Sequence, residues 1–398
     1  MRIIMLHPHD PTAFHVGGIG TFINNYLKYA PSDFEIHFVG ITRDSRRFPV
    51  GEWKTVEREG RSFRFLPVLF EPETGRRRIP LSLQFSWALN RYRSQIDFRK
   101  AILEFHRIEP SFVLRDLKNP KVLFLHGHMG DLYHPKTEVR WGRFPWIYFF
   151  IEGKLIKRMT RIHIVREDAV SFYQRRYPAL AGRFSFLPTW VDDGVFKIEN
   201  EQTRRKWKEE LSLESGMERG GKILLFVGRF EGQKDPMFLL NAFHQLRKGM
   251  DKVFLVMIGK GSLERPMTAY LEEHGLSEGV RILRPMAHAL LVRWMNAADA
   301  FVLSSAFEGM PFVLAEAIQC GLPVVAMKVG ETGRFIRAPA AGRLVEERNP
   351  AVFAAAIQEV LRQPRDREAC QEQVSEHVAS KRLKLLYDDH RKLGAAFL

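Results

Sequence analysis

The sequence is poor in cysteine and has no long apolar run. Its 398 residues include only Cys320 and Cys370, both in segments of helical pattern and without metal-ligand spacing. A disulfide framework is therefore excluded, and a reducing compartment is favoured. No run of 18 apolar residues occurs, which excludes an ordinary membrane-spanning helix. The opening MRIIMLHP has too short an apolar run and no basic lead-in for a signal peptide, so we expect a cytoplasmic protein.

Several common catalytic signatures are also missing. The sequence contains no DxD carboxylate pair, no Walker A loop and no HExxH helix. We therefore expect no metal and no cofactor, and any charged substrate must be held by side chains and backbone amides.

Basic charge is present in excess, and it is unevenly distributed. The net charge is +15, and residues 1–190 hold 31 Lys and Arg against 18 Asp and Glu, whereas the rest holds 30 against 28. An anionic membrane surface or polyanion would suit the first half, and a merely basic soluble protein is the alternative. Nucleic acid is not expected, because no recognition motif accompanies the charge.

Strands and helices alternate through both halves of the chain. Short apolar runs such as 2–6, 121–126, 223–227 and 324–327 fit buried parallel strands, and amphipathic helical patterns separate them. A polar stretch at 199–222 marks a boundary. The pattern predicts an α/β protein of two Rossmann-like doubly wound domains facing across a cleft. We expect domains at 1–195 and 196–379, with a helix from about 380 to 398 packing back on the first.

Two features of the first domain are candidates for ligand contact. Gly17 and Gly18 follow the first strand and precede a helix, which suits either a tight turn or the approach of a ligand to the backbone. His126, with His128 beyond it, comes at the carboxyl end of a strand, where ligands of open α/β sheets bind. Arginines 76–78 before an aromatic segment, and the aromatic run 145–159, have the composition of interfacial helices, although helices packed on their own sheet are the alternative.

The stretch 304–330 of the second domain combines an anion site with two carboxylates. Pro311 fits the first helical position, and the amides of the following turn are free to bind an anion. Gly309 suits a tight turn, while Glu308 precedes the helix and Glu316 lies within it. Arg229 and Lys234, after another strand, add a cation pair suited to a diphosphate. A ligand with both phosphates and hydroxyls, such as a nucleotide-sugar, fits this set.

The motifs LFVGRFEGQK (225–234) and SSAFEGMPFVLAEAIQCGLPVVAMKVG (304–330) resemble the retaining GT-B-fold glycosyltransferases of family 4. GGIGTF (17–22) and the segment 341–357 agree with that family as well. The resemblance implies transfer of a hexose-type sugar from a nucleotide-diphosphate sugar to a lipid-linked, polysaccharide or other glycan acceptor, with retention and without metal. The alternatives are a GT-B epimerase or hydrolase of nucleotide-sugars and a non-catalytic basic GT-B subunit. The expected location is cytoplasmic, peripheral on the inner membrane face.

The resemblance also implies residue roles. Glu308 and His126 act on the transferred sugar, and Glu316 binds the donor ribose. The other implied donor contacts are Arg229 and Lys234 at the diphosphate, the 310–313 amides (Met310, Phe312 and Val313), and Leu283 and Arg284 at the base, with Gly17 and Gly18 at the phosphate or acceptor.

The sequence departs from the family pattern at two places. The interdomain joint reads Thr189-Trp190-Val191-Asp192 instead of Asn-Gly-Val-Asp, which removes a turn glycine and bears on the hinge. Arg334 stands where an acidic residue is usual, which bears on the donor-sugar preference.

Overall fold

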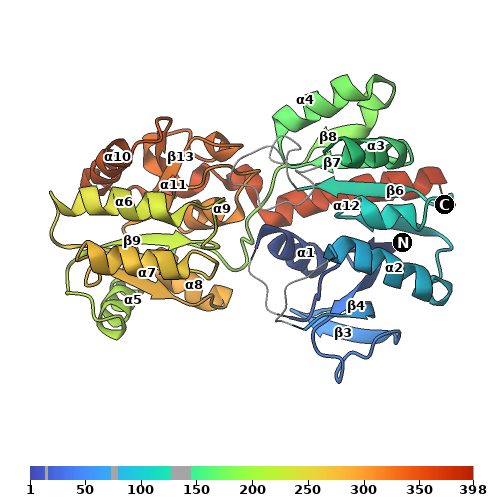
Figure 1. Ribbon diagram of the computed structural model, residues 1–398, viewed down its shortest axis with the longest axis horizontal. Helices are drawn as coiled ribbons and strands as arrows, with labels where there is room; N and C mark the ends of the chain where they lie inside the picture. Colours follow the sequence, from blue (N-terminus) through green and yellow to red (C-terminus); the bar gives the residue numbers. More distant parts are fainter. Residues whose placement is uncertain (14–16, 73–78, 127–144, 398) are drawn as a thin grey trace.

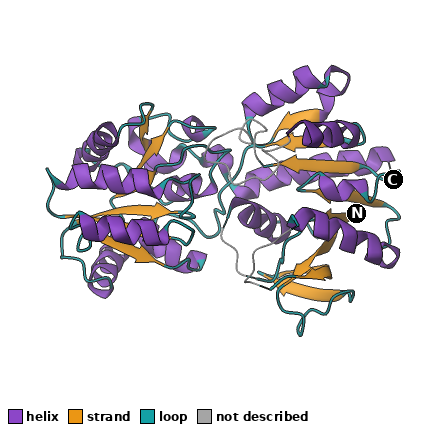
Figure 2. Ribbon diagram, in the orientation of Figure 1, coloured by secondary structure: helices purple, strands orange, loops and turns teal. Residues whose placement is uncertain are grey.

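The computed structural model describes residues 1–13, 17–72, 79–126 and 145–397, without the side chains of 145–149. Two α/β domains lie side by side, each a central sheet with helices on both faces (Figures 1 and 2). The predicted fold class is confirmed, including its two parallel sheets.

The N-terminal sheet has eight strands in the order β3-β4-β2-β1-β5-β6-β7-β8. All neighbouring pairs are parallel except β3–β4, an antiparallel hairpin at the edge. The strands are β1 (Arg2–Leu6), β2 (Glu35–Thr42), β3 (Lys54–Arg58), β4 (Arg61–Phe70), β5 (Ala101–Phe105), β6 (Lys121–Leu125), β7 (Arg161–Ile164) and β8 (Phe184–Phe186).

Alternation along the strands gives this sheet two apolar faces. Ile3 and Met5 pack under α1 (Gly18–Lys28) and α12 (Ala379–Phe397). Ile4 and Leu6 face the opposite layer. That layer consists of α2 (Leu81–Tyr92), the short turn η2 (Glu109–Phe112), α3 (Pro145–Ile156) and α4 (Glu167–Arg176).

The C-terminal sheet has six parallel strands in the order β11-β10-β9-β12-β13-β14. They are β9 (Lys222–Val227), β10 (Val253–Ile258), β11 (Val280–Leu283), β12 (Ala300–Leu303), β13 (Val324–Met327) and β14 (Gly342–Val345). The covering helices are α5 (Glu201–Glu214), α6 (Pro236–Arg247), α7 (Glu264–Glu273), α8 (His288–Ala297), α9 (Phe312–Gln319), α10 (Pro350–Arg362) and α11 (Arg367–Glu372).

The chain crosses between the domains twice. It leaves the first domain after β8 and returns beside that crossing, where Val191 and Val378 form an isolated β-bridge. Helix α12, red in Figure 1, then lies among the elements of the N-terminal domain. The Tyr387 hydroxyl donates to the Tyr26 carbonyl at 2.8 Å, and the buried His390 ring bonds to Glu104. The last helix of the chain is thus part of the core of the first domain.

Three strands were not among those predicted. β5 contains the buried Glu104, which breaks an otherwise apolar run, and β3 is polar because it forms an exposed edge. β14 lies in the segment 341–357, in which the sequence analysis named no strand. Its carbonyls and amides pair with β13, and a Cβ at Gly342 would come within 1.9 Å of the Val324 carbonyl oxygen.

Candidate active site in the interdomain cleft

A cleft of about 590 Å³ lies between the carboxyl ends of the two sheets. Loops after β1, β5, β6 and β7 form one wall, and loops after β9, β10, β11 and β12 form the other. Crevices beyond the carboxyl ends of parallel strands are the usual ligand sites of this architecture. The predicted residues lining it are Gly17, Gly18, His126, Arg229, Lys234, Glu308, Met310, Phe312, Val313 and Glu316.

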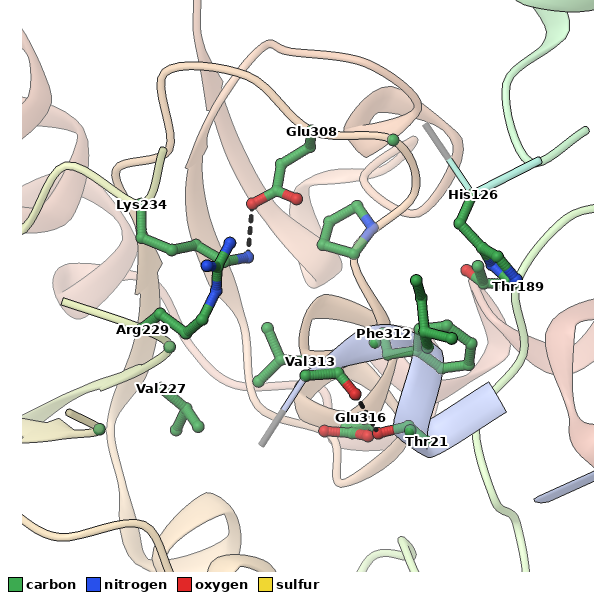
Figure 3. A pocket seen from close by; sticks show the side chains of 18 of the residues that line it. Thr21, His126, Thr189, Val227, Arg229, Lys234, Glu308, Phe312, Val313 and Glu316 are labelled. Carbon is green, nitrogen blue, oxygen red and sulfur yellow. Dashed lines mark hydrogen bonds and ion pairs between the residues drawn. The ribbon is translucent and has the colours of Figure 1, made fainter. Parts of the chain in front are cut away.

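A buried ion pair forms the centre of the C-terminal wall. The Lys234 ammonium donates to Glu308 Oε1 at 2.5 Å (Figure 3), and the Ser305 hydroxyl donates to the same oxygen at 2.6 Å. The side chains of Lys234 and Glu308 are only 15% and 6% exposed. Charge-assisted bonds of this kind fix both side chains in one orientation before any ligand enters.

Arg229 is oriented by a glutamine that the sequence analysis did not single out. An Arg229 Nη donates to Gln233 Oε1 at 2.8 Å, and Gln233 Nε2 donates to the Phe307 carbonyl at 3.3 Å. Arg348 donates to the carbonyls of Ser304 and Ser305 in the loop after β12. Hydrogen bonds that join the loops after β9 and β12 therefore hold Arg229 and Lys234 in place.

The turn carrying Glu308 is packed from two sides. A Cβ at Gly309 would lie 3.2 Å from the His126 carbonyl oxygen, and one at Gly330 would lie 2.2 Å from that of Glu308. The Glu331 amide donates to the Gly309 carbonyl at 2.9 Å. Gly309 is not among the glycines of positive φ, so a left-handed backbone does not account for it. Close packing explains the glycine instead.

Helix α9 begins one residue later than predicted. Pro311 is the N-cap with φ −72° and ψ 118°, and Phe312 opens the helix. The first amides of a helix have no intrahelical acceptor, so those of Phe312 and Val313 can donate to a ligand. The Phe312 ring packs edge-on to Trp190 at 6.2 Å and reaches Gly18 of the other domain.

Glu316 lies one turn into α9, buried beside Thr21 at the foot of the cleft (Figure 3). Burial raises the pKa of its carboxyl to about 8; the charge of Asp192 acts in the same direction, and that of Lys234 opposes it. The Glu316 carboxyl therefore holds its proton at higher pH than a free glutamate does.

The N-terminal wall carries His126 just past the end of β6. His126 Nε2 lies 2.9 Å from His106 Nδ1, and the two rings are stacked. Burial, assisted by the charge of Arg107, lowers the pKa of His126 to about 3, so the ring is neutral. His128 lies outside the described residues. Arg107, which also lines the cleft, was missed because it follows β5, a strand that the sequence analysis did not identify.

Leu283 and Arg284 do not line the cleft. Arg284 is 75% exposed and pairs with Glu264 at 2.8 Å, while Leu283 packs against the domain core. The following residues Pro285, Met286 and His288 reach the cleft instead. A contact of Leu283 and Arg284 with a base stays a prediction.

The interdomain joint is packed with aromatic rings. Trp190 is fully buried, with its ring 4.5 Å from that of Phe22. The Asp192 carboxylate accepts from Lys28 and the Tyr29 hydroxyl, both at 2.7 Å. Trp190 thus replaces the expected turn glycine with a bulky contact between the joint and the first domain.

The described residues contain neither a metal-ligand cluster nor a membrane-spanning helix. No group of three or more His, Cys, Asp or Glu side chains there is arranged to hold a metal ion. Among the same residues, no helix is both long and apolar enough to cross a membrane.

Comparison with known proteins identifies the class. Two solved structures cover nearly the whole chain: sucrose-phosphate synthase from Thermosynechococcus elongatus (TM-score 0.81, 19% identity, 99% of each chain) and HepE from Anabaena with UDP and glucose (TM-score 0.70, 14% identity, 98% of this chain and 99% of that one). The fold is therefore GT-B. Residues 208–377 match the family described as "Glycosyl transferases group 1". The C-terminal part of the chain is thus similar to group 1 glycosyltransferases, which confirms the resemblance.

Curated glycosyltransferases are similar to this chain over a shorter part of its sequence than the solved structures are. The D-inositol 3-phosphate glycosyltransferase of Frankia alni is 37% identical over 158 residues, which is 37% of this chain and 39% of that protein. D-inositol 3-phosphate glycosyltransferase 2 of Catenulispora acidiphila is 28% identical over 237 residues, which is 57% of this chain and 54% of that protein. The chain therefore spans about half of these relatives' length or less.

Proposed function

We propose that this protein is a retaining glycosyltransferase. It moves a hexose-type sugar from a nucleotide-diphosphate sugar to a lipid-linked, polysaccharide or other glycan acceptor. One observation carries the proposal: Arg229, Lys234, the α9 N-terminus and the carboxyl groups of Glu308 and Glu316 form a single wall of the interdomain cleft. The name of HepE's complex and the names of the curated relatives support a nucleotide-sugar donor and a hydroxylated acceptor.

The cations act on the leaving group. In the proposed reaction the glycosidic C–O bond breaks with its electron pair passing to the diphosphate. An acceptor hydroxyl oxygen forms the new bond to carbon, and its proton passes to a phosphate oxygen. Negative charge grows on the diphosphate, so Arg229, Lys234 and the amides of Phe312 and Val313 stabilise the transition state more than the ground state. With this stabilisation no metal is required, and activity should persist in a chelator.

The carboxylates select the hydroxyls. Glu308, held in place by Lys234 and Ser305, accepts from hydroxyls of the transferred sugar. Glu316 accepts from the ribose diol, and His126 offers a neutral ring at the reactive face from the opposite wall. Gly17 and Gly18 bring the N-terminus of α1 to the phosphate or acceptor side.

A donor panel tests this proposal. Nucleotide-sugars that bind the native state raise the thermal midpoint by mass action, so the best donor stands out and is then assayed with glycan and lipid acceptors. We expect acceptor-dependent transfer with retention that is lost in Glu316→Ala and Arg229→Ala while both variants stay folded. Full activity of Glu316→Ala would contradict the site assignment. Donor turnover without acceptor would indicate an epimerase or hydrolase instead.

The proposed acceptor side includes an anionic membrane surface. On the layer formed by α2, η2 and α3, the rings of Trp87, Phe112 and Phe150 are 65%, 53% and 61% exposed. Arg115 lies 4.2 Å from the Phe112 ring centroid, and Lys154 lies 4.2 Å from that of Phe150. Aromatic rings beside basic groups suit the headgroup region of anionic lipid. Arginines 76–78 lie outside the described residues.

Vesicle sedimentation tests the membrane contact. We expect binding to vesicles of anionic lipid, weaker binding to neutral ones, and loss of binding in a Trp87→Ala/Phe112→Ala variant. Leu213→Ala removes a 69% exposed apolar side chain of the other domain and should have no effect. Equal binding to both vesicle types, or tighter binding to long nucleic acid, would argue against the membrane.

A further inference from the structure

Arg334, the residue that replaces the family's usual acid, joins the two domains. Its Nε donates to Glu331 Oε2 at 2.6 Å within the C-terminal domain, and an Nη pairs with Glu167 of the N-terminal domain. The Glu167 amide donates to Glu331 Oε1 at 2.7 Å. The same guanidinium lies 4.4 Å from the ring centroid of Phe186, another residue of the N-terminal domain.

This cluster is connected directly to the turn that carries Glu308. The Glu331 amide, in the same residue that binds Arg334, donates to the Gly309 carbonyl at 2.9 Å. Arg166, the neighbour of Glu167, donates to the Glu308 carbonyl at 3.3 Å. Arg166 of the N-terminal domain therefore binds the Glu308 carbonyl directly. Its neighbour Glu167 acts on the Gly309 carbonyl through Glu331, to which its amide donates.

We propose that Glu167, Arg334 and Glu331 form an interdomain latch that positions the Glu308–Gly309 turn for sugar transfer. The inference rests on the proposed function, and these three act as positioning residues without touching the substrate. An acid at position 334 would face two carboxylates, Glu167 and Glu331, and would repel both. The arginine instead pairs with both carboxylates and so links the two domains beside the turn.

The exposure of the cluster determines how the latch behaves. Glu167 is 65% exposed and Arg334 is 32% exposed, so solvent screens their pairing, while Glu331 is only 12% exposed. Screened pairs weaken with salt. The latch can therefore open to admit a donor and release a product, and its strength should depend on ionic strength.

A charge swap tests the latch in the full-length protein. We expect Glu167→Arg and Arg334→Glu each to lower kcat about tenfold, the scale of a small misplacement near a reacting centre, with donor affinity within about twofold. The double variant restores an opposite-charge pair and should recover most of kcat. Arg293→Glu breaks a comparable pair with Glu210 inside the C-terminal domain and serves as the control that leaves kcat unchanged.

Domain separation provides a readout that does not depend on transfer. With fluorophores on the two domains, each single variant should show a broader, salt-insensitive distance distribution, and the double variant should return to the narrow, salt-sensitive native one. Single and double variants with equal kcat or equal distributions would overturn the latch. If the native protein transfers no sugar yet shows the distance effects, the proposed function fails and the latch stands.

Discussion

At the scale of single residues, the two carboxylates of the cleft differ because their surroundings differ. Glu308 has an ammonium and a hydroxyl on one oxygen, whereas burial raises the pKa of Glu316 and the charge of Asp192 adds to the effect. The positions were apparent from the sequence, but their surroundings are formed by partners from distant segments.

Substitutions in the Lys234–Glu308 pair can separate its contribution to the free energy of unfolding from its contribution to sugar transfer. Lys234→Met leaves Glu308 buried without its counter-ion, which should lower the free energy of unfolding by about 3 kcal/mol and abolish transfer. Glu308→Gln added to it removes the stranded charge, so stability should largely return while activity stays lost. Chemical denaturation and transfer assays on the same samples check both. Recovery of activity in the double variant would contradict the proposed role of the cation.

Glu316 makes a pH-dependent contribution to stability with a definite sign. Because its pKa is raised to about 8 in the folded chain, the folded state binds this proton more tightly than the unfolded state. Its contribution therefore becomes less favourable as pH rises from about 5 to about 8, by up to about 1.4 kcal/mol per unit. Denaturation at several pH values should show the free energy of unfolding of Glu316→Gln rising relative to that of the native chain over this window. A difference in the free energy of unfolding that does not change with pH would contradict the prediction.

The same group should make donor binding pH-dependent. If Glu316 binds the ribose as proposed, its ionised carboxylate accepts from both ribose hydroxyls, so donor affinity should rise with pH toward 8, by up to about tenfold per unit. Calorimetry in two buffers of different ionisation enthalpy should detect the released proton, and Glu316→Gln should release none. A nucleotide-sugar is the suitable ligand, because its phosphates do not titrate in this range.

At the scale of elements, the Glu308 turn depends on the backbone that packs on it. Gly330→Ala places a Cβ where only 2.2 Å separates it from the Glu308 carbonyl oxygen, at a φ of +52°. We expect activity to fall at least about tenfold, because the turn must shift. Gly333→Ala, three residues on, meets only Leu344 at 3.7 Å and should keep most of its activity. Equal losses of activity in the two variants would contradict the proposed role of this contact.

Local pattern was sufficient for most elements and for the C-terminal wall. Buried parallel strands are continuous apolar runs, so β1, β9 and β13 were recognisable, and the loops after β1 and β9 carry site residues. β5 was not recognisable because it contains Glu104. The partner of this buried carboxyl is His390, nearly 300 residues away along the chain. Arg107 was missed with it, and Gln233 and Arg348 act through contacts that no local pattern encodes.

Arg334 is the clearest case of information that only the fold supplies. The sequence shows that an arginine stands where an acid is usual, and from the sequence alone we related this change to the donor-sugar preference. In the structure it does not line the cleft and pairs with Glu167 of the other domain. A residue so far along the chain from its partner can be interpreted only once the two domains are placed.

At the scale of the whole molecule, the chain ends inside the domain in which it begins. Helix α12 places Leu383, Leu386 and Tyr387 in the same apolar cluster as Ile3 and Phe22. The two crossings lie side by side at Val191 and Val378 and share the buried Trp190 joint. The N-terminal domain is therefore completed only when the last helix has been made.

Two adjacent leucines of α12 test this dependence. Leu386 is 3% exposed in the core of the N-terminal domain, whereas Leu385 is 60% exposed. Leu386→Ala should lower the free energy of unfolding by about 2 to 4 kcal/mol, because it removes buried apolar contact and leaves a cavity, while Leu385→Ala should change it little. Limited proteolysis should cut first in the N-terminal domain of Leu386→Ala, although the substitution lies at the far end of the sequence. Destabilisation confined to residues 201–372 would show instead that α12 serves the other domain.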